Sequence, residues 1–365
     1  MPRPQPRANQ PGTAPRALLA TGPQYEFVDG AEDLASYCQG GYHPIAINDI
    51  LYERYRVDHK LGYGGHSTTW LARDRIEPRY VAVKVGTADS SGQKEAGVLS
   101  ELESRNSDAK PSLALVLDHF EISGPNGTHP CLVTLPARCS LARAKEMSRS
   151  GLFQLDVARF LTRQLVVPVA HVHQQGYVHG GVPSHVVLPA WLGTKSEEIK
   201  ISEAQIILSD FGVSFDPSKE SRFESYAPLE IRPPEARFEP LQPLSFASDI
   251  WSLGCGRSWA ATPGVVGQVD GEDRQARDQR SSERGPLAWT WDQRFEDSIQ
   301  EPRREKNMPT ICEAEKADFF AMIRSMLAFR LEERPTAKQV VESHWMRKWA
   351  APADRPLAWQ SRLCC

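Results

Sequence analysis

The sequence lacks the features that would place it in a membrane, on nucleic acid or in a disulfide-stabilised class. It contains no run of about eighteen apolar residues, so we expect no transmembrane helix. Its 43 basic and 46 acidic residues give a net charge of −3, which offers no general attraction to nucleic acid or to an anionic membrane. Its seven cysteines are scattered without metal-ligand spacing, and we interpret them as reduced intracellular thiols.

Acidic residues are also missing from residues 1–24, which carry six prolines and three arginines. We interpret this stretch as a disordered tail and not as a mitochondrial presequence, because the prolines would interrupt the amphipathic helix of a presequence. The final pair, Cys364 and Cys365, is similar to a double-cysteine prenylation end but has no polybasic flank. The whole chain of 365 residues, 40% hydrophobic and 24% charged, predicts a globular protein of two lobes or domains.

A glycine-rich hairpin is predicted where alternating residues flank Gly62, Gly64 and Gly65. Because glycine lets the backbone approach a ligand closely, such a hairpin can present its N–H groups to phosphates. Lys84 follows at the end of the strand-like run Val-Ala-Val-Lys, and Glu95 lies on a candidate helix beyond it. A lysine on a strand is usually solvated, but a partner carboxylate in Glu95 would hold its ammonium group toward the same phosphates.

A second candidate site is Asp210-Phe211-Gly212, which follows the apolar residues 206–208. The apolar run predicts a buried strand that ends by placing one carboxylate at the mouth of a cleft, with a flexible glycine behind it. Asp-Phe-Gly alone most often marks a plain turn. It gains weight here from the glycine hairpin, the lysine and the glutamate that precede it in order. We therefore expect Asp210 to hold a metal ion on nucleotide phosphates.

With these motifs in this order, the chain resembles a protein kinase from about residue 42 to 350. It is most similar to the fungal branch of the SR-protein kinases, which are serine/threonine kinases of the splicing-factor type. The similarity is carried by residues 40–44 (GGYHP), by residues 124–129 (GPNGTH) and by Ser67, where most kinases have a third glycine. It implies an α+β fold of two lobes: a small antiparallel β lobe with one helix, and a larger, mainly helical lobe.

The resemblance also implies a binding site for ATP and Mg²⁺ between the lobes. Thr69 and Ala82 would form the upper wall of the adenine slot, Thr134 would be the gatekeeper, and Leu188 would be the floor. Lys84, Glu95 and Asp210 would be the catalytic residues, and Asp210 would also be the metal ligand. The full set of implied nucleotide-binding residues is Leu61, Gly62, Gly64, Thr69, Ala82, Lys84, Thr134, Leu135, Ala137, Leu188 and Asp210.

The catalytic loop departs from the family pattern of His-Gly-Asp followed five residues later by Asn. After His179, this chain has Gly181 at the position of the catalytic aspartate, Val186 at that of the metal-binding asparagine and Pro183 at that of a phosphate-contacting lysine. The lost carboxylate would orient the substrate hydroxyl and accept its proton, an assistance worth roughly a hundred- to ten-thousandfold in rate. The nearby His185 is interpreted as structural. These changes predict a pseudokinase that binds nucleotide through one metal ion.

Other expectations concern the helical lobe. A long helix is predicted over about residues 155–174, and Pro168 within it predicts an interruption that distorts the platform under the catalytic loop. Phe211 and His179 are expected to stack with Leu99 as an internal spine. Gly180 replaces the arginine that would grip a phosphorylated activation segment, so activation by that route is not expected.

Two charged residues in this lobe have implied structural roles. Glu235 would form a buried ion pair with Arg334, and Asp249 would accept N–H bonds from the catalytic loop. Between residues 256 and 286 the resemblance lapses into a polar stretch without apolar period, which we expect to be poorly ordered. An acidic docking groove for arginine-serine repeats cannot be traced there.

We divide the chain into a disordered tail (1–24), an extension (25–51), a kinase-like domain (52–350, with lobes 52–136 and 137–350) and a second tail (351–365).

Three hypotheses for the function remain. The first is an ATP-binding SR-kinase homologue with weak or lost phosphoryl transfer, acting as a regulator or scaffold. The second is an active serine/threonine kinase with an unusual metal arrangement, and the third is a degenerate, poorly folded product. We expect a monomer in the cytoplasm, the nucleus or both, whose protein partner is arginine/serine-rich or regulatory.

Overall fold

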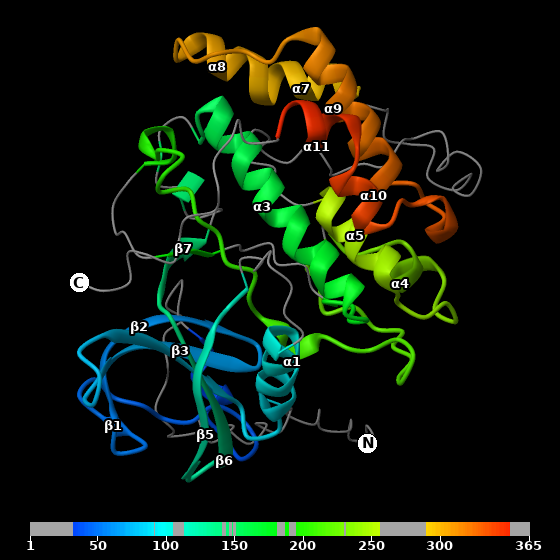
Figure 1. Ribbon diagram of the computed structural model, residues 1–365. Coiled ribbons are helices and arrows are strands. Elements are labelled where there is room, and N and C mark those ends of the chain that lie inside the picture. Colours follow the sequence, from blue (N-terminus) through cyan, green and yellow to red (C-terminus); the bar gives the residue numbers. More distant parts are fainter. Residues whose placement is uncertain are drawn as a thin grey trace, which may run out of the picture.

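The computed structural model describes residues 32–90, 92–104, 113–140, 144–145, 148, 151–180, 187–189, 195–229, 231–255 and 290–350. The expected tails at 1–24 and 351–365, and the stretch 256–286 expected to be poorly ordered, lie outside these residues. In the part that is described, a β-sheet with one helix forms one end of the molecule and a group of helices forms the other (Figure 1). The expected two-lobed α+β fold is therefore confirmed.

The smaller lobe is built on an antiparallel sheet with the strand order β1-β2-β3-β4-β6-β5. Helix α1 (Gly92–Ser104) packs beside β5 and β6. Burial alternates along β3 because successive side chains of a strand point to opposite faces, and its Trp70 and Ala72 enter the sheet's core. The strands are β1 (Ile50–Leu51), β2 (Tyr55–Gly64), β3 (Ser67–Asp74), β4 (Tyr80–Gly86), β5 (Val116–Gly124) and β6 (Gly127–Thr134).

The predicted glycine hairpin joins β2 to β3. Gly62 pairs with Thr69 and Gly64 with Ser67, so the turn is made by the two residues between them, Gly65 and His66. An irregularity in the register separates Lys60 from Gly62, just before the hairpin tip. The tip therefore extends from a strand whose pairing is locally irregular, while β3 pairs with β4 without a register shift.

The larger lobe surrounds the long helix α3 (Leu155–Gln174), which runs through its centre (Figure 1). A short pair of strands, β7 (Ala137–Ser140) and β8 (Val187–Pro189), lies near the junction with the sheet. The other elements of this lobe are η2 (Ser196–Glu198), η3 (Phe211–Val213), α4 (Glu235–Phe238), α5 (Phe246–Cys255), α7 (Trp291–Phe295), η4 (Glu296–Gln300), α8 (Glu301–Glu305), α9 (Glu313–Met326), η5 (Leu331–Glu333), α10 (Ala337–Val341) and α11 (His344–Lys348).

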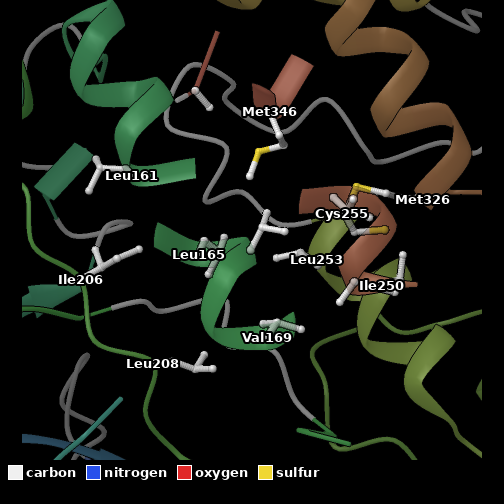
Figure 2. Close-up of a cluster of buried hydrophobic side chains, with 14 of the residues drawn as sticks. Leu161, Leu165, Val169, Ile206, Leu208, Ile250, Leu253, Cys255, Met326 and Met346 are labelled. Carbon is white, nitrogen blue, oxygen red and sulfur yellow. The ribbon is translucent and has the colours of Figure 1, made fainter. Parts of the chain in front are cut away.

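The prediction that Pro168 interrupts the long helix is wrong, because α3 continues through it to Gln174. Proline supplies no N–H group, which costs roughly 3 kcal/mol inside a helix. Tertiary packing offsets this cost, since Leu165, Val169 and Val172 are each at most 3% exposed. Figure 2 shows Leu165 and Val169 directed into a cluster with residues of α5, including Leu253.

Within the described residues, no helix is both long enough and apolar enough to span a membrane. The same part of the chain holds no group of three or more His, Cys, Asp or Glu side chains placed to bind a metal by themselves.

Candidate active site

Three of the predicted residues, Lys84, Glu95 and Asp210, meet where the two lobes join. The ammonium group of Lys84, on β4, donates to both carboxylate oxygens of Glu95 on α1, at 3.0 and 2.8 Å. It also donates to Asp210 Oδ1 at 2.8 Å. Burial alone would lower the pKa of Lys84, but the two carboxylates outweigh it and raise that pKa, so the ammonium stays charged.

Asp210 is the most open member of this group. Its side chain is 68% exposed, against 24% for Lys84 and 6% for Glu95. Its backbone lies in the left-handed region, with φ of 69°, just before η3. The charge of Lys84 lowers the pKa of the Asp210 carboxyl, so the group is ionised at neutral pH.

Phe211 fixes the position of this carboxylate. Its N–H donates to Glu95 Oε1 at 3.0 Å, and its ring is fully buried in the same apolar cluster as Leu99 of α1. The ring of His179 meets that of Phe211 nearly edge-on, with centroids 4.7 Å apart. The three residues expected to form an internal spine therefore lie together and connect α1 to the helical lobe.

The implied adenine-facing residues are aligned by the sheet register. Thr69 lies opposite Lys84, and Ala82 lies opposite both Leu71 and Thr134. Leu135 and Ala137 follow β6 and are half-buried, while Leu61 at the base of the hairpin is 41% exposed. The glycines of the hairpin have open surroundings, since a Cβ atom added at Gly62 or Gly64 would meet no atom within 4 Å. Leu188 lies in β8, paired with Cys139.

The start of the catalytic loop is held by Asp249 of α5. Its carboxylate accepts the N–H of His179 at 2.6 Å and that of Gly180 at 3.0 Å, and it contacts His173 Nε2 at 2.9 Å. This is the arrangement that the resemblance implied for Asp249. Gly180 has φ of +79°, and a Cβ atom there would lie 2.6 Å from the carbonyl oxygen of Val213. An arginine at position 180 would therefore require a different backbone.

The expectations for Gly181, Pro183, His185 and Val186 lie outside the described residues. They rest on the sequence, which has no acidic residue between His179 and Leu188. The described geometry thus contains the lysine, the glutamate and the exposed aspartate, and the sequence has no carboxylate between His179 and Leu188.

Comparison with known proteins accounts for this arrangement. A model of the protein kinase domain matches residues 55–346. The chain belongs to the protein kinase family. It is 31% identical over 150 residues to a serine/threonine protein kinase of Aspergillus fumigatus, covering 40% of this chain and 38% of that protein. It is also 41% identical over 110 residues to SRSF protein kinase 3 of Homo sapiens, covering 28% of this chain and 19% of that protein.

A further relative is the serine/threonine-protein kinase spk-1 of Caenorhabditis elegans, 31% identical over 187 residues, or 49% of this chain and 18% of that protein. This chain therefore spans well under half the length of these curated relatives. The likeness to SR-type kinases expected from the sequence is confirmed. Protein kinases as a class use ATP with Mg²⁺. In other members of the family, a lysine, a glutamate and an aspartate at the positions of Lys84, Glu95 and Asp210 act on these ligands.

Two features of the structure could not be predicted from the sequence. Glu220, in the segment after η3, pairs with Lys94 of α1 at 3.1 Å and with Arg222 at 2.5 Å. His66, at the hairpin tip, lies edge-on to the ring of Tyr226, with the ring centroids 6.1 Å apart. It also contributes to the lowered pKa of Asp210. The residue types at these positions do not indicate which residues distant in sequence will come into contact.

Proposed function

We propose that this kinase homologue binds Mg-ATP between its lobes and transfers phosphate to protein serine or threonine weakly or not at all. It would then act as a regulator or scaffold of the SR-protein-kinase type. One observation carries the proposal: Lys84, Glu95 and Asp210 are assembled with short contacts, whereas position 181, where the family has its base, is a glycine.

The residues fit the nucleotide's phosphates and one metal ion. Lys84 is already charged and close to the open carboxylate of Asp210, so its ammonium can shift from Asp210 to phosphate oxygens while Glu95 keeps its orientation. Asp210 would hold Mg²⁺, which neutralises phosphate charge when bound. The second ligand usual in the family is absent because Val186 has no side-chain oxygen.

Phosphoryl transfer also needs a group that orients the attacking hydroxyl and accepts its proton. The sequence offers Gly181 at that position and no carboxylate elsewhere between residues 179 and 188. Binding and transfer are therefore expected to separate in this protein: the first is supported by the charged cluster, and the second lacks its base.

The alternative is an active serine/threonine kinase acting on arginine/serine-rich proteins. It is favoured by the likeness to SRSF protein kinase 3, whose name describes kinase activity on SRSF proteins, and by the assembled spine of Leu99, Phe211 and His179. In that case Asp210 and an unusual metal arrangement would perform the reaction.

The deciding experiment measures transfer of labelled phosphate from Mg-ATP to an arginine-serine peptide, together with Mg-ATP binding by calorimetry. We expect the wild type to bind Mg-ATP and to transfer little or no label, and Gly181→Asp/Val186→Asn to raise transfer. Transfer by the wild type at an ordinary kinase rate, abolished in Lys84→Ala, would establish the alternative. A wild type that binds no Mg-ATP would refute the proposal.

A further inference from the structure

Residues 32–43, which we call the strap, pack across the small lobe before the kinase match begins at residue 55. The strap includes the single turn η1 (Leu34–Ser36). Its Tyr42 is only 5% exposed, and its hydroxyl donates to the carbonyl oxygen of Gly64 at 2.7 Å. This bond reaches from the strap to the tip of the glycine hairpin.

We propose that Tyr42 is a positioning residue for the phosphates of bound nucleotide, acting by holding the peptide between Gly64 and Gly65. The inference rests on the nucleotide binding proposed above. A trans peptide points its carbonyl and its N–H in opposite directions, so fixing the Gly64 carbonyl fixes the direction of the Gly65 N–H. Backbone N–H groups of this kind are what a glycine hairpin offers to phosphate oxygens.

The tie matters because the glycines of the hairpin make little packing contact, although His66 at the tip accepts the N–H of Thr87 at 2.9 Å. Gly62, Gly64 and Gly65 would each accept a Cβ atom without any contact within 4 Å. Glycine also has more conformational freedom than any other residue, which makes an untied tip costly to order around a ligand. A hydrogen bond already formed in the free protein removes part of that cost.

The strap is itself firmly attached to the lobe, so it can serve as an anchor. Asn126, in the turn between β5 and β6, donates through Nδ2 to the Tyr42 carbonyl at 2.6 Å, and its own carbonyl accepts the N–H of Gly40 at 2.9 Å. Glu32 forms an ion pair with Lys60 of β2 and accepts a bond from the Tyr37 hydroxyl. The strap is thus attached both to β2 and to the turn between β5 and β6.

The same strap contacts the segment that leads into α1. The carbonyls of Gly41 and Gly40 accept the N–H groups of Ala88 and Asp89, at 3.1 and 2.9 Å. These two residues lie between β4, which carries Lys84, and α1, which carries Glu95. The strap therefore connects the hairpin to the part of the lobe that orients the charged cluster.

Burial and nearby Glu32 raise the pKa of Tyr42, so its hydroxyl keeps the proton that it donates.

The test compares the full-length wild type with Tyr42→Phe, which removes the hydroxyl and keeps the ring. The control is Tyr52→Phe, which removes a hydroxyl from a tyrosine that is 60% exposed. Calorimetry with Mg-ATP and with adenosine separates phosphate contacts from base contacts. We expect Tyr42→Phe to weaken Mg-ATP binding roughly three- to tenfold, the range for one hydrogen bond, with adenosine binding unchanged. The unfolding temperature should fall by no more than the loss of one hydrogen bond explains.

A second measurement does not depend on nucleotide. Amide hydrogen exchange of residues 62–66 in the free protein should be faster in Tyr42→Phe than in Tyr52→Phe, with no change in the helical lobe. Gly124→Ala gives an independent route, because its Cβ would lie 2.2 Å from the ring of His43 and displace the strap from the β5–β6 end. It should reproduce the selective loss of Mg-ATP binding.

Each outcome decides the inference. Equal losses of Mg-ATP and adenosine binding would show a general structural effect and overturn it, as would unchanged hairpin exchange in Tyr42→Phe. If the wild type binds neither ligand, the proposed nucleotide binding fails. The exchange data then still decide whether Tyr42 holds the hairpin.

Discussion

Two ion pairs in this member of the protein kinase family join similar groups in opposite surroundings. Glu235 and Arg334, in the helical lobe, have side chains only 2% and 0% exposed. Arg334 donates to both oxygens of Glu235 and to the carbonyls of Ala328, Ala247 and Phe329. Every contact is internal, so this pair has no capacity left for a ligand.

The pair of Lys84 and Glu95 is instead open on one side. Lys84 is 24% exposed and shares its third contact with Asp210, which is 68% exposed. The difference shows how a fold separates structural from functional charge. A saturated pair stabilises the lobe, whereas an unsaturated pair beside an exposed carboxylate can exchange a partner for phosphate.

The largest effect is expected from breaking the saturated pair. Arg334→Ala leaves Glu235 buried without its partner, which costs about 3–5 kcal/mol in free energy of unfolding. Urea denaturation measures this loss. Arg330→Ala is the control, since its side chain is 71% exposed; a surface ion pair is worth about 1 kcal/mol or less. Equal losses in the two variants would contradict the structural role of Arg334.

A third pair extends the comparison to the sheet, where Asp74 is fully buried against Arg54. Bonds from Arg54 lower the pKa of Asp74 to about 2. A lowered pKa means that the stabilisation is present above the ordinary value near 4 and is lost as the pH falls toward 2. Asp74→Asn should therefore be less stable by about 2 kcal/mol at pH 7 and should lack this part of the acid transition.

Urea denaturation between pH 2 and 7 measures this dependence. Glu77→Gln is the control because that side chain is 53% exposed. Other carboxylates titrate in the same range, so the informative quantity is the difference between each variant and the wild type. A difference that does not change with pH would contradict the role assigned to Asp74.

The open pair should affect binding more than stability. Lys84→Ala should lower the free energy of unfolding by about 1–2 kcal/mol, because Glu95 keeps the N–H bond from Phe211 and the shortened side chain leaves space for water beside the exposed Asp210. It should also abolish the stabilisation that Mg-ATP gives the wild type, which Arg334→Ala should keep. Thermal unfolding with and without Mg-ATP tests both, with the exposed Lys338→Ala as control. Loss of the nucleotide effect in both Lys84→Ala and Arg334→Ala would remove the distinction between the pairs.

The sequence predicted the parts of the site that are encoded locally. Lys84 in an apolar strand and Asp210 after an apolar run are short-range patterns, and the structure joins Lys84 to both Glu95 and Asp210. The buried strand expected at residues 206–208 is not formed, since Leu208 makes only an isolated bridge with Leu113. The ion pair of Glu235 with Arg334 came only from the family resemblance, because nothing in either local segment identifies the other. The interpretation of Gly181 and Val186 stays a prediction.

What failed or was missed depends on three-dimensional packing. Pro168 is tolerated because its neighbours on α3 are buried against α5, which local propensity cannot show. The bond from Tyr42 to Gly64 depends on the path of the strap, and the pairing of Lys94 with Glu220 joins residues 126 positions apart. Many exposed lysines and glutamates could form such a pair, so the sequence offers no way to choose among them.

The smallest effect is expected from that last pair. Glu220 is 39% exposed and contacts Lys94 and Arg222, so it places a permanent negative charge between α1 and the segment after η3. Because Gly180 stands where the family's phosphate-gripping arginine would be, this charge can hold the segment without phosphorylation. Glu220→Gln should change the free energy of unfolding by about 0.5 kcal/mol or less at low salt.

Its effect should be clearer in local motion. Amide exchange in the first turn of α1 should be roughly twofold faster in Glu220→Gln than in the exposed control Glu224→Gln, and about 0.5 M salt should remove the difference by screening the pair. If the two variants exchange alike at low salt, then the contact does not restrain α1. The position of Glu95 would in that case depend on Lys84, on the N–H of Phe211 and on the packing of Leu99.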